Sequence, residues 1–170
     1  MRYSLCNHWE FTEQWSDAFC RGEPVSCRPV RLPHTCRELP LHYADPSDYE
    51  MVCGYRRTLT VPDAPRVFLR FDGAAHQGGI YLNGQLAGQH QGGYTGFTIE
   101  ITDLVHRGKE NLLAVRLDTR EDPSLPPFGF VIDYLTYGGL YREVWLEATA
   151  ESRLTDLFVY TPTLQEAVVQ

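Results

Sequence analysis

The sequence contains no long apolar run. No stretch of its 170 residues stays apolar over the roughly 20 positions that a membrane-spanning helix requires. Polar side chains also interrupt the first residues, MRYSLCNHW, so they lack the apolar core of a signal peptide. We therefore expect a protein that has no contact with a membrane and that works in the cytoplasm.

The sequence has fewer basic than acidic residues. Lys and Arg number 15 against 22 Asp and Glu, which gives a net charge of −7 at pH 7. A protein that binds nucleic acid through its phosphates needs a basic face, so we expect no nucleic acid partner. With 43% hydrophobic and 22% charged residues, the composition is typical of a globular protein. A chain of this length can bury one well-formed core but not two.

Cysteine motifs are also lacking. The five cysteines lie in the first third of the chain, and their spacing matches neither Cys-x-x-Cys nor any common zinc site. An odd number of cysteines without a signal peptide favours reduced thiols over a disulfide framework. We therefore predict free cysteines, with no metal site and no cofactor in this chain. The cysteines are Cys6, Cys20, Cys27, Cys36 and Cys53.

The sequence has no long helical pattern, and from Gly54 onward apolar residues alternate with polar ones. Such alternation is typical of β-strands with one face toward a core. The pair Asn83-Gly84 between two of these runs predicts a tight hairpin, and Pro29 within an earlier run favours an edge strand. The predicted strands cover residues 25–32, 55–61, 66–71, 80–82, 85–88, 97–101, 113–117, 141–148 and 154–160.

Short strands separated by turns predict an all-β fold, an antiparallel β-sandwich of the jelly-roll type that galactose-binding domains adopt. We assign residues 1–150 to this domain. The run at 154–160 follows a polar break and has no later strand with which to pair. Residues 151–170 are therefore interpreted either as the truncated start of a following domain or as a C-terminal edge strand.

The stretch 132–146 is the most distinctive part of the chain, because an acid and three tyrosines surround Gly138-Gly139. Glycines allow backbone angles and close approaches that a Cβ would forbid. The pattern predicts a shaped loop that presents Asp133 at a surface and is anchored by the strand behind it. In the alternative interpretation, Asp133 binds nearby backbone N–H groups in a turn, and Tyr134 and Tyr137 pack in the core.

Several segments together carry a family resemblance. They are Arg31-Leu-Pro-His-Thr35, Phe71-Asp-Gly73, Ile80-Tyr-Leu-Asn-Gly84, Gly88–Phe97, Asn111-Leu-Leu-Ala-Val115 and Tyr137–Val144. Each is weak alone, but their order across about residues 9–148 is specific. The chain resembles the N-terminal sugar-binding domain of glycoside hydrolase family 2 enzymes and is most similar to that of the β-galactosidases.

This resemblance implies a jelly-roll domain that is followed by immunoglobulin-like domains and by a TIM barrel with both catalytic glutamates. Retaining hydrolysis needs two carboxyl groups about 5–5.5 Å apart, and the barrel that carries them is not in this chain. The chain alone is therefore expected to have no catalytic residues and no enzyme activity. It is expected to lend a loop to the active-site rim of an enzyme that hydrolyses terminal β-linked sugars.

The resemblance also implies site residues. A sugar-contacting Asp precedes the family's Gly-[Leu/Ile]-Tyr-Arg motif and matches Asp133, which in some members also contacts a bound monovalent cation. The family's second contact, an Asn, falls on Ala75, and the adjacent His76 is the candidate to replace it. A monovalent or divalent cation is thus expected only in the full enzyme. The candidate substrate-binding residues are Asp133, Tyr134, Tyr137 and His76.

Other charged residues are assigned structural roles. Asp72 and Asp118 stand at strand ends and are expected to stabilise the scaffold, and Arg142 is expected to form an ion pair with a loop acid. Two further function classes stay open: a free-standing carbohydrate-binding module and a purely architectural domain. Within the family, β-glucuronidase and β-mannosidase are alternatives. The expected partners are a glycoside substrate, the downstream domains and further copies in a homo-oligomer.

Overall fold

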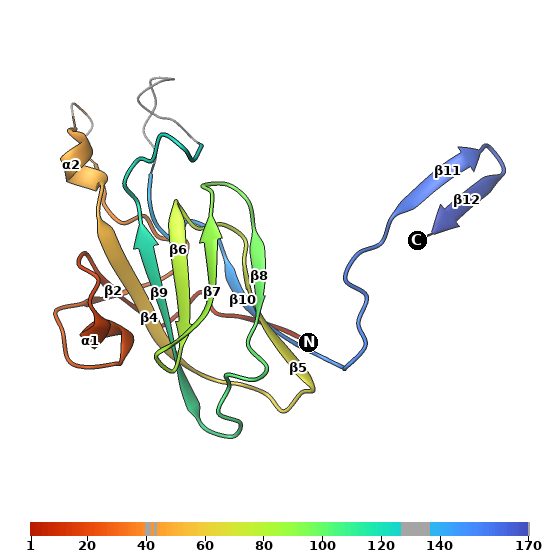
Figure 1. Cartoon of the computed structure of the whole chain (residues 1–170), viewed down its shortest axis with the longest axis horizontal. Helices are drawn as coiled ribbons and strands as arrows, with labels where there is room; N and C mark the ends of the chain where they lie inside the picture. The colour runs from red at the N-terminus through yellow and green to blue at the C-terminus, as the bar shows by residue number, and fades with distance from the viewer. Residues whose placement is uncertain (40–41, 43, 127–136, 170) are drawn as a thin grey trace.

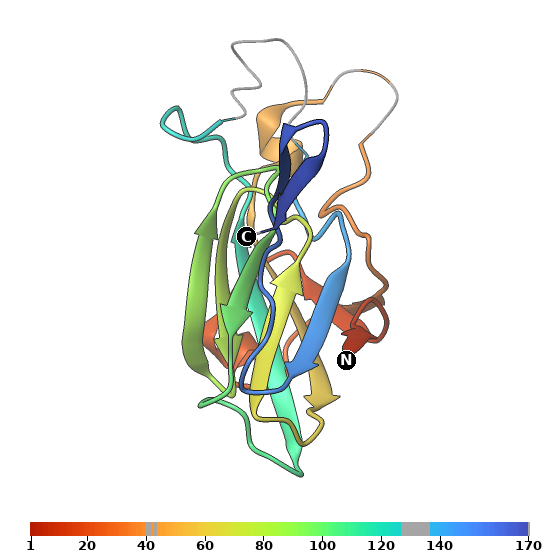
Figure 2. The same cartoon turned by 90° about the vertical axis from the view of Figure 1, so that its right-hand side faces the viewer.

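The computed structural model describes residues 1–39, 42, 44–126 and 137–169. Most of its strands form two antiparallel sheets that lie face to face (Figures 1 and 2). These strands are β1 (Arg2–Ser4), β2 (Trp9–Thr12), β3 (Arg28–Val30), β4 (Val52–Thr60), β5 (Arg66–Phe71), β6 (Gln77–Leu82), β7 (Gln85–Gln91), β8 (Phe97–Glu100), β9 (Glu110–Asp118) and β10 (Val144–Thr149). The six-stranded sheet has the order β3-β2-β4-β9-β6-β7, and the four-stranded sheet has the order β1-β10-β5-β8. The predicted antiparallel β-sandwich is confirmed.

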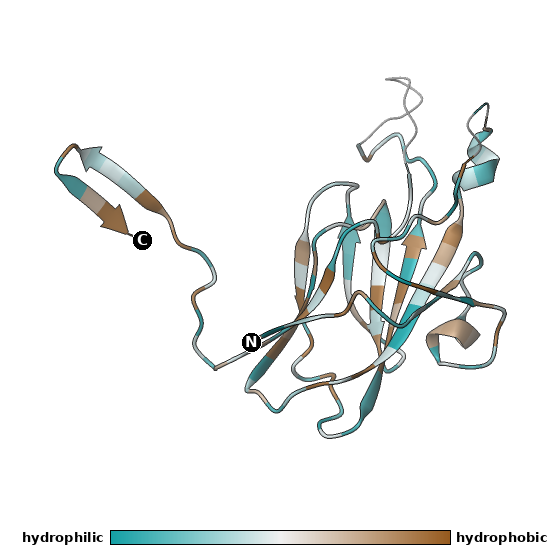
Figure 3. Cartoon of the chain, turned by 180° about the vertical axis from the view of Figure 1, so that it is seen from behind, coloured by the Kyte–Doolittle hydropathy of each residue, from teal (hydrophilic) through white to brown (hydrophobic). Residues whose placement is uncertain are grey.

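The core lies between the two sheets and is built from alternate residues of their strands. In β5, Val67, Leu69 and Phe71 face the core, whereas Arg66 lies on the outer face and binds Glu100. Burying each large apolar side chain stabilises the fold by roughly 1.5–3 kcal/mol. Figure 3 shows the resulting pattern, in which apolar and polar bands alternate along the strands.

The predicted hairpin at Asn83-Gly84 is confirmed and joins β6 to β7. Both turn residues have positive φ, 53° and 80°, as a two-residue hairpin turn requires. The Asn83 side chain also ties the turn to β9, because its amide donates to Asn111 Oδ1 at 2.9 Å and its oxygen accepts from Leu112 N at 3.0 Å. Asn111 is fully buried, and its Oδ1 also accepts from His106 N at 2.7 Å.

The two helices of the described residues are each a single turn, α1 (Asp17–Cys20) and α2 (Pro46–Tyr49). Ser16 caps α1, since its hydroxyl accepts from Phe19 N at 3.1 Å. Phe19 then packs on Gly54 of β4, where a Cβ would come within 2.9 Å of its ring. In the parts of the chain that the structure describes, no helix is long and apolar enough to cross a membrane.

Of the strands predicted within the sandwich, only 66–71 has the bounds that the structure shows, and most of the others differ by one to three residues at an end. The run at 25–32 contributes only β3, which lies at the edge of its sheet as Pro29 predicts. The strand predicted from residue 141 begins at Val144, because Tyr141 turns its hydroxyl to the carbonyl oxygen of Gly93 instead of facing a neighbouring strand.

The C-terminal prediction is wrong in one respect. The strand expected at 154–160 begins at Val159 and does have a partner, because β11 (Val159–Thr163) pairs with β12 (Glu166–Val169) in a two-stranded sheet of their own. Figure 1 shows this hairpin at the end of an extended segment, apart from the sandwich. The hairpin is thus not joined to an edge of either large sheet. That residues 151–170 begin a following domain stays a prediction.

Candidate functional site

The residues on either side of segment 120–137, Thr119 and Gly138, meet at one place on the sandwich. Thr119, directly after β9, is fully buried, and its hydroxyl accepts from Met51 N at 2.9 Å and donates to the carbonyl oxygen of Tyr49 at 3.1 Å. Gly138, at the other end, lies so close that a Cβ would overlap the Thr119 side chain. The two ends of the segment are therefore packed on each other, and only glycine fits at position 138.

Gly139, the next residue, makes a second close approach, to the backbone of His34. Its φ of +135° lies in a region that residues with a side chain rarely adopt, and a Cβ would come within 2.5 Å of the carbonyl oxygen of His34. Its backbone exchanges two hydrogen bonds with Ala75, at 3.1 and 3.2 Å. These bonds hold Gly139 beside Ala75, so the contact comes from a different segment than the following strand that was predicted to anchor the loop.

Residues 34–36 also hydrogen-bond to the backbone of residues 138–140. His34 N donates to the carbonyl oxygen of Leu140, and Cys36 N donates to that of Gly138, both at 2.9 Å. Residues 34–36, Ala75, Thr119 and residues 138–140 together are called the loop base below. Four segments that are distant in sequence therefore hold the two ends of segment 120–137 in place.

A buried polar cluster supports the loop base. Tyr55 is fully buried, and burial raises its pKa well above the ordinary value, so its hydroxyl keeps its proton. Burial also lowers the pKa of His34, which leaves its ring neutral. The Tyr55 hydroxyl and His34 Nδ1 lie 2.8 Å apart and share a hydrogen bond. Beside it, the Sγ atoms of Cys36 and Cys53 lie 3.2 Å apart, and all five cysteines are free thiols, as predicted.

His76, a predicted substrate contact, lies directly under the start of the loop. Its residue is only 6% exposed, and its backbone N donates to the carbonyl oxygen of Asp118 at 3.2 Å. Burial lowers the pKa of His76, and hydrogen bonds to the backbone of Arg120 and Thr119 act in the opposite direction. The ring therefore supports the exit of the loop from β9. Its contact with a sugar stays a prediction.

Of the other predicted site residues, the structure describes Tyr137 but not Asp133 or Tyr134. Tyr137 is 50% exposed and stands immediately before Gly138, so the structure brings it beside the loop base, together with His76. Asp133 and Tyr134 lie outside the described residues, and their roles stay predictions.

The scaffold carboxylates have the structural roles that were predicted. Asp72 accepts from Arg70 Nε at 2.9 Å and from Trp145 Nε1 at 2.8 Å; burial opposes ionisation there, but these bonds give a net lowering of its pKa. Asp118 accepts from Arg120 at 2.6 and 2.8 Å, and these bonds hold its pKa below the ordinary value. Carboxylates that are bound to cations in this way suit neither a catalytic acid nor a free nucleophile.

The ion pair expected for Arg142 is not observed. Among the described residues its guanidinium binds no carboxylate, and instead donates to the carbonyl oxygens of Asp72 and Tyr94, both at 3.3 Å. It packs 5.3 Å from the centre of the Tyr141 ring. Arg142 therefore joins the end of β5 to the bend after β7, because two backbone carbonyls lie within its reach.

The described part of the chain does not form a metal site. Among residues 1–39, 42, 44–126 and 137–169, no group of three or more His, Cys, Asp or Glu side chains is arranged to hold a metal ion. The cation contact that the family resemblance implies belongs to Asp133, outside this part of the chain.

Sequence reasoning missed two residues of this region. Thr119 packs on Gly138, and Tyr55 hydrogen-bonds to His34. In the sequence, however, Thr119 only follows a strand and Tyr55 is an ordinary strand tyrosine, so neither stands out. The glycine pair did signal a close approach, but nothing in the sequence showed which residues would approach it.

Comparison with known proteins agrees with this architecture. Residues 29–150 match the family described as glycosyl hydrolases family 2, sugar binding domain. A beta-galactosidase of Thermoanaerobacter pseudethanolicus is 37% identical over 145 residues, which are 83% of this chain and 20% of that protein. A beta-glucuronidase of Bacteroides fragilis is 36% identical over 162 residues, which are 93% of this chain and 22% of that protein.

The comparison with solved structures agrees with this family match. The crystal structure of Bacteroides uniformis beta-glucuronidase superposes with a TM-score of 0.82 at 29% identity, covering 99% of this chain and 21% of that one. The chain thus spans about one fifth of the length of these relatives. Since the family match extends over most of the sandwich, the chain belongs to glycosyl hydrolases family 2, within the sugar-binding domain of that family.

Proposed function

We propose that this domain is part of a β-galactosidase-like enzyme that hydrolyses terminal β-linked sugars, and that it completes the rim of the active site. Segment 120–137 reaches that rim, and Asp133 contacts hydroxyl groups of the terminal sugar. The nucleophile and the acid/base belong to a TIM barrel beyond immunoglobulin-like domains of the same protein. A cytoplasmic homo-oligomer and a monovalent cation at Asp133 are further parts of this proposal.

The observation that supports it is the construction of the loop base. Thr119 and Gly138 pack on each other, and residues 34–36 and Ala75 bind the backbone of 138–140 from both sides. A loop that presents a binding residue needs fixed ends, since misplacement of about 1 Å costs much of its effect. The loop base provides such ends on a rigid sandwich.

A carboxylate is suited to the role given to Asp133. It accepts two or more charge-assisted hydrogen bonds, so it can bind vicinal sugar hydroxyls. Each hydrogen bond to a charged group contributes roughly 1.5–3 kcal/mol. Asp72 and Asp118 do not compete for a role in the chemistry, because their oxygens are held by Arg70, Trp145 and Arg120.

The terminal sugar has two candidates. A galactoside follows from the relatives named beta-galactosidase, of which the Thermoanaerobacter protein is 37% identical. A glucuronide is the second candidate, because the Bacteroides fragilis protein named beta-glucuronidase is 36% identical over a longer stretch, 162 residues. The two substrates differ in charge, so one assay with matched substrates separates them.

The test uses the full-length enzyme that contains this domain, assayed with p-nitrophenyl β-galactoside and β-glucuronide. We expect the galactoside to be the better substrate and Asp133→Ala to lower its kcat/KM by about tenfold or more, the effect of losing one charged hydrogen bond. Asp63→Ala is the matched control, because Asp63 is fully exposed in a turn on the scaffold. A near-wild-type kcat/KM for Asp133→Ala would instead favour a purely architectural domain.

A further inference from the structure

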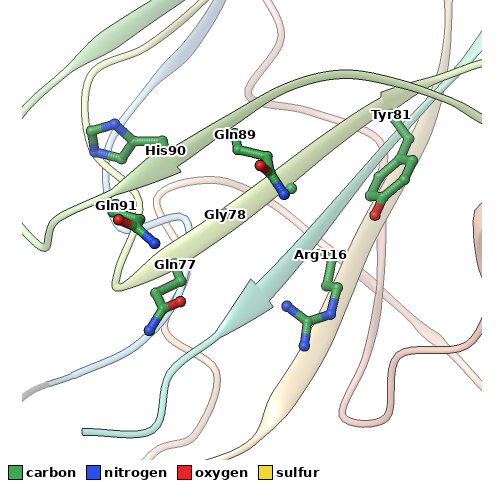
Figure 4. Close-up of a pocket in the computed structure, with 8 residues that line it drawn as sticks. Gln77, Gly78, Tyr81, Gln89, His90, Gln91 and Arg116 are labelled. Atoms are coloured by element: carbon green, nitrogen blue, oxygen red, sulfur yellow. The ribbon is translucent and has the colours of Figure 1, made fainter. Parts of the chain in front are cut away.

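The outer face of the six-stranded sheet contains a hollow that the proposed function does not use. Its volume is about 390 Å³, which falls in the size range of small-molecule sites. It lies on β6, β7 and β9, and Figure 4 shows polar side chains around it. The residues that line it include Gln77, Gly79, Tyr81, Gln89, Gln91 and Arg116.

The strand register explains why a hollow forms there. Gly79 on β6 pairs with Gln89 on β7 and with Arg116 on β9, so these three positions form one row on the outer face. The next row on the same face has Gln77 between Gln91 and Asp118. Because Gly79 has no side chain, the centre of this array is open while its surroundings carry long polar side chains.

Tyr81 forms one wall of the hollow and is held in place. The Trp15 ring packs on it, with ring centres 5.4 Å apart and an angle of 31° between the planes. A Cβ on Gly79 would come within 3.2 Å of Tyr81 Cε2. The missing side chain at Gly79 therefore both opens the hollow and admits the aromatic ring that borders it.

The polar groups of the hollow are available for a ligand. Among the described residues, the side-chain amides of Gln89 and Gln91 have no protein partner, and each offers both donors and an acceptor. Gln77 uses its Nε2 to donate to Asp122 at 3.1 Å, which leaves its oxygen to accept from a ligand. Arg116 has a long contact, at 3.5 Å, with Asp118. This mixture of donors and acceptors suits hydroxyl groups, which both donate and accept.

The charges at the edge of the hollow balance one another. Asp118 binds both Arg116 and Arg120, and Asp122 lies beside Gln77. Arg116 is the charged residue of the lining, and Asp118, 3.5 Å from its guanidinium, carries the opposite charge. Amide groups, one aromatic wall and balanced charge fit an uncharged, polyhydroxylated molecule.

We propose that this hollow is a second saccharide site, which binds an uncharged sugar of one or two pyranose rings. The Tyr81 ring contacts the apolar face of a sugar ring, and Gln89, Gln91 and Arg116 bind its hydroxyls. The site lies beside Asp118, at the strand end from which segment 120–137 departs. A glycan bound there is thus held near the proposed rim, but its binding does not depend on Asp133.

The test measures binding of lactose to the 170-residue chain by saturation-transfer NMR and by shifts of the glutamine side-chain amide signals. We expect millimolar affinity, with shifts at Gln89 and Gln91. The double variant Gln89→Ala/Gln91→Ala should bind at least about tenfold more weakly, since it loses two amide hydrogen-bonding groups. The matched control is Gln85→Ala, because Gln85 is exposed on the same strand but lies outside the hollow.

The remaining measurements separate this site from the proposed function. Asp133→Ala should leave lactose binding to the chain unchanged, whereas loss of binding in that variant would assign the sugar to the rim and overturn the second site. Equal affinity of the double variant and Gln85→Ala would also overturn it. Stronger binding of methyl β-glucuronide than of lactose would refute an uncharged ligand. Absence of the glutamine shifts in the full-length protein would show that another domain covers this face, which is also incompatible with the proposal.

Discussion

Gly139 offers the sharpest test of the loop base. The change Gly139→Ala places a Cβ within 2.5 Å of the His34 carbonyl oxygen, at a residue whose φ is +135°. A backbone conformation of this kind costs roughly 1–3 kcal/mol for a residue with a side chain. Moving Gly139 away from His34 also weakens its two hydrogen bonds to Ala75, each worth roughly 0.5–1.5 kcal/mol. The expected loss of unfolding free energy is therefore about 2–5 kcal/mol.

Urea denaturation followed by tryptophan fluorescence measures this loss. With an m value of about 2 kcal/mol/M, in the middle of the usual range for urea, the midpoint should fall by roughly 1–2.5 M. Gly108→Ala is the matched control, because Gly108 also has a positive φ, +68°, but no atom lies within 4 Å of the point that a Cβ would occupy there. That control should lose only about 1–2 kcal/mol, the cost of the left-handed backbone. Equal midpoints for the two variants would refute the close packing at the loop base.

Two further predictions concern the scaffold. Asn111→Ala should lower the unfolding free energy by about 3 kcal/mol or more, because it removes four hydrogen bonds of a fully buried side chain. The Asn111 Oδ1 accepts from Asn83 Nδ2 and His106 N, and its Nδ2 donates to the carbonyl oxygens of His106 and Lys109. Asn7→Ala, at an exposed position, is the control in the same denaturation assay, and equal losses would contradict the role of Asn111. Hydrogen bonds from Arg66 and Thr102 lower the pKa of Glu100 to about 2. Since a lowered carboxyl pKa stabilises the fold above the unfolded value of about 4.3, this contribution should disappear as the pH falls from about 4.3 toward 2. An NMR titration of Glu100 with a midpoint near that of an unfolded glutamate would contradict it.

Much of the fold could be predicted because its signals are local. Alternation of apolar and polar residues identified β4, β5, β8 and β9, since successive side chains of a strand point to opposite faces. Asn83-Gly84 predicted its hairpin because few residue pairs accept positive φ at both positions. Pro29 predicted an edge strand, because proline has no N–H for a second neighbour.

Strand ends were predicted less well. Residues 141–143 continue the alternation of β10, yet Tyr141 and Arg142 bind carbonyl oxygens of the bend after β7. The pairing of β11 with β12 was missed, since the short run Glu166–Val169 carries little periodicity. In both cases the deciding interaction is a contact with another segment, which periodicity does not report.

The sequence by itself determined the layered β architecture, the family and the close approach at Gly138-Gly139. Only the tertiary structure decided how these glycines are held, because the loop base joins residues 34–36, Ala75, Thr119 and residues 138–140 from four separate segments. It also decided that Gly79 opens a polar hollow on the outer face, through the register of three strands. Local preferences act over a few residues, whereas these features arise from packing between segments that are far apart in the chain.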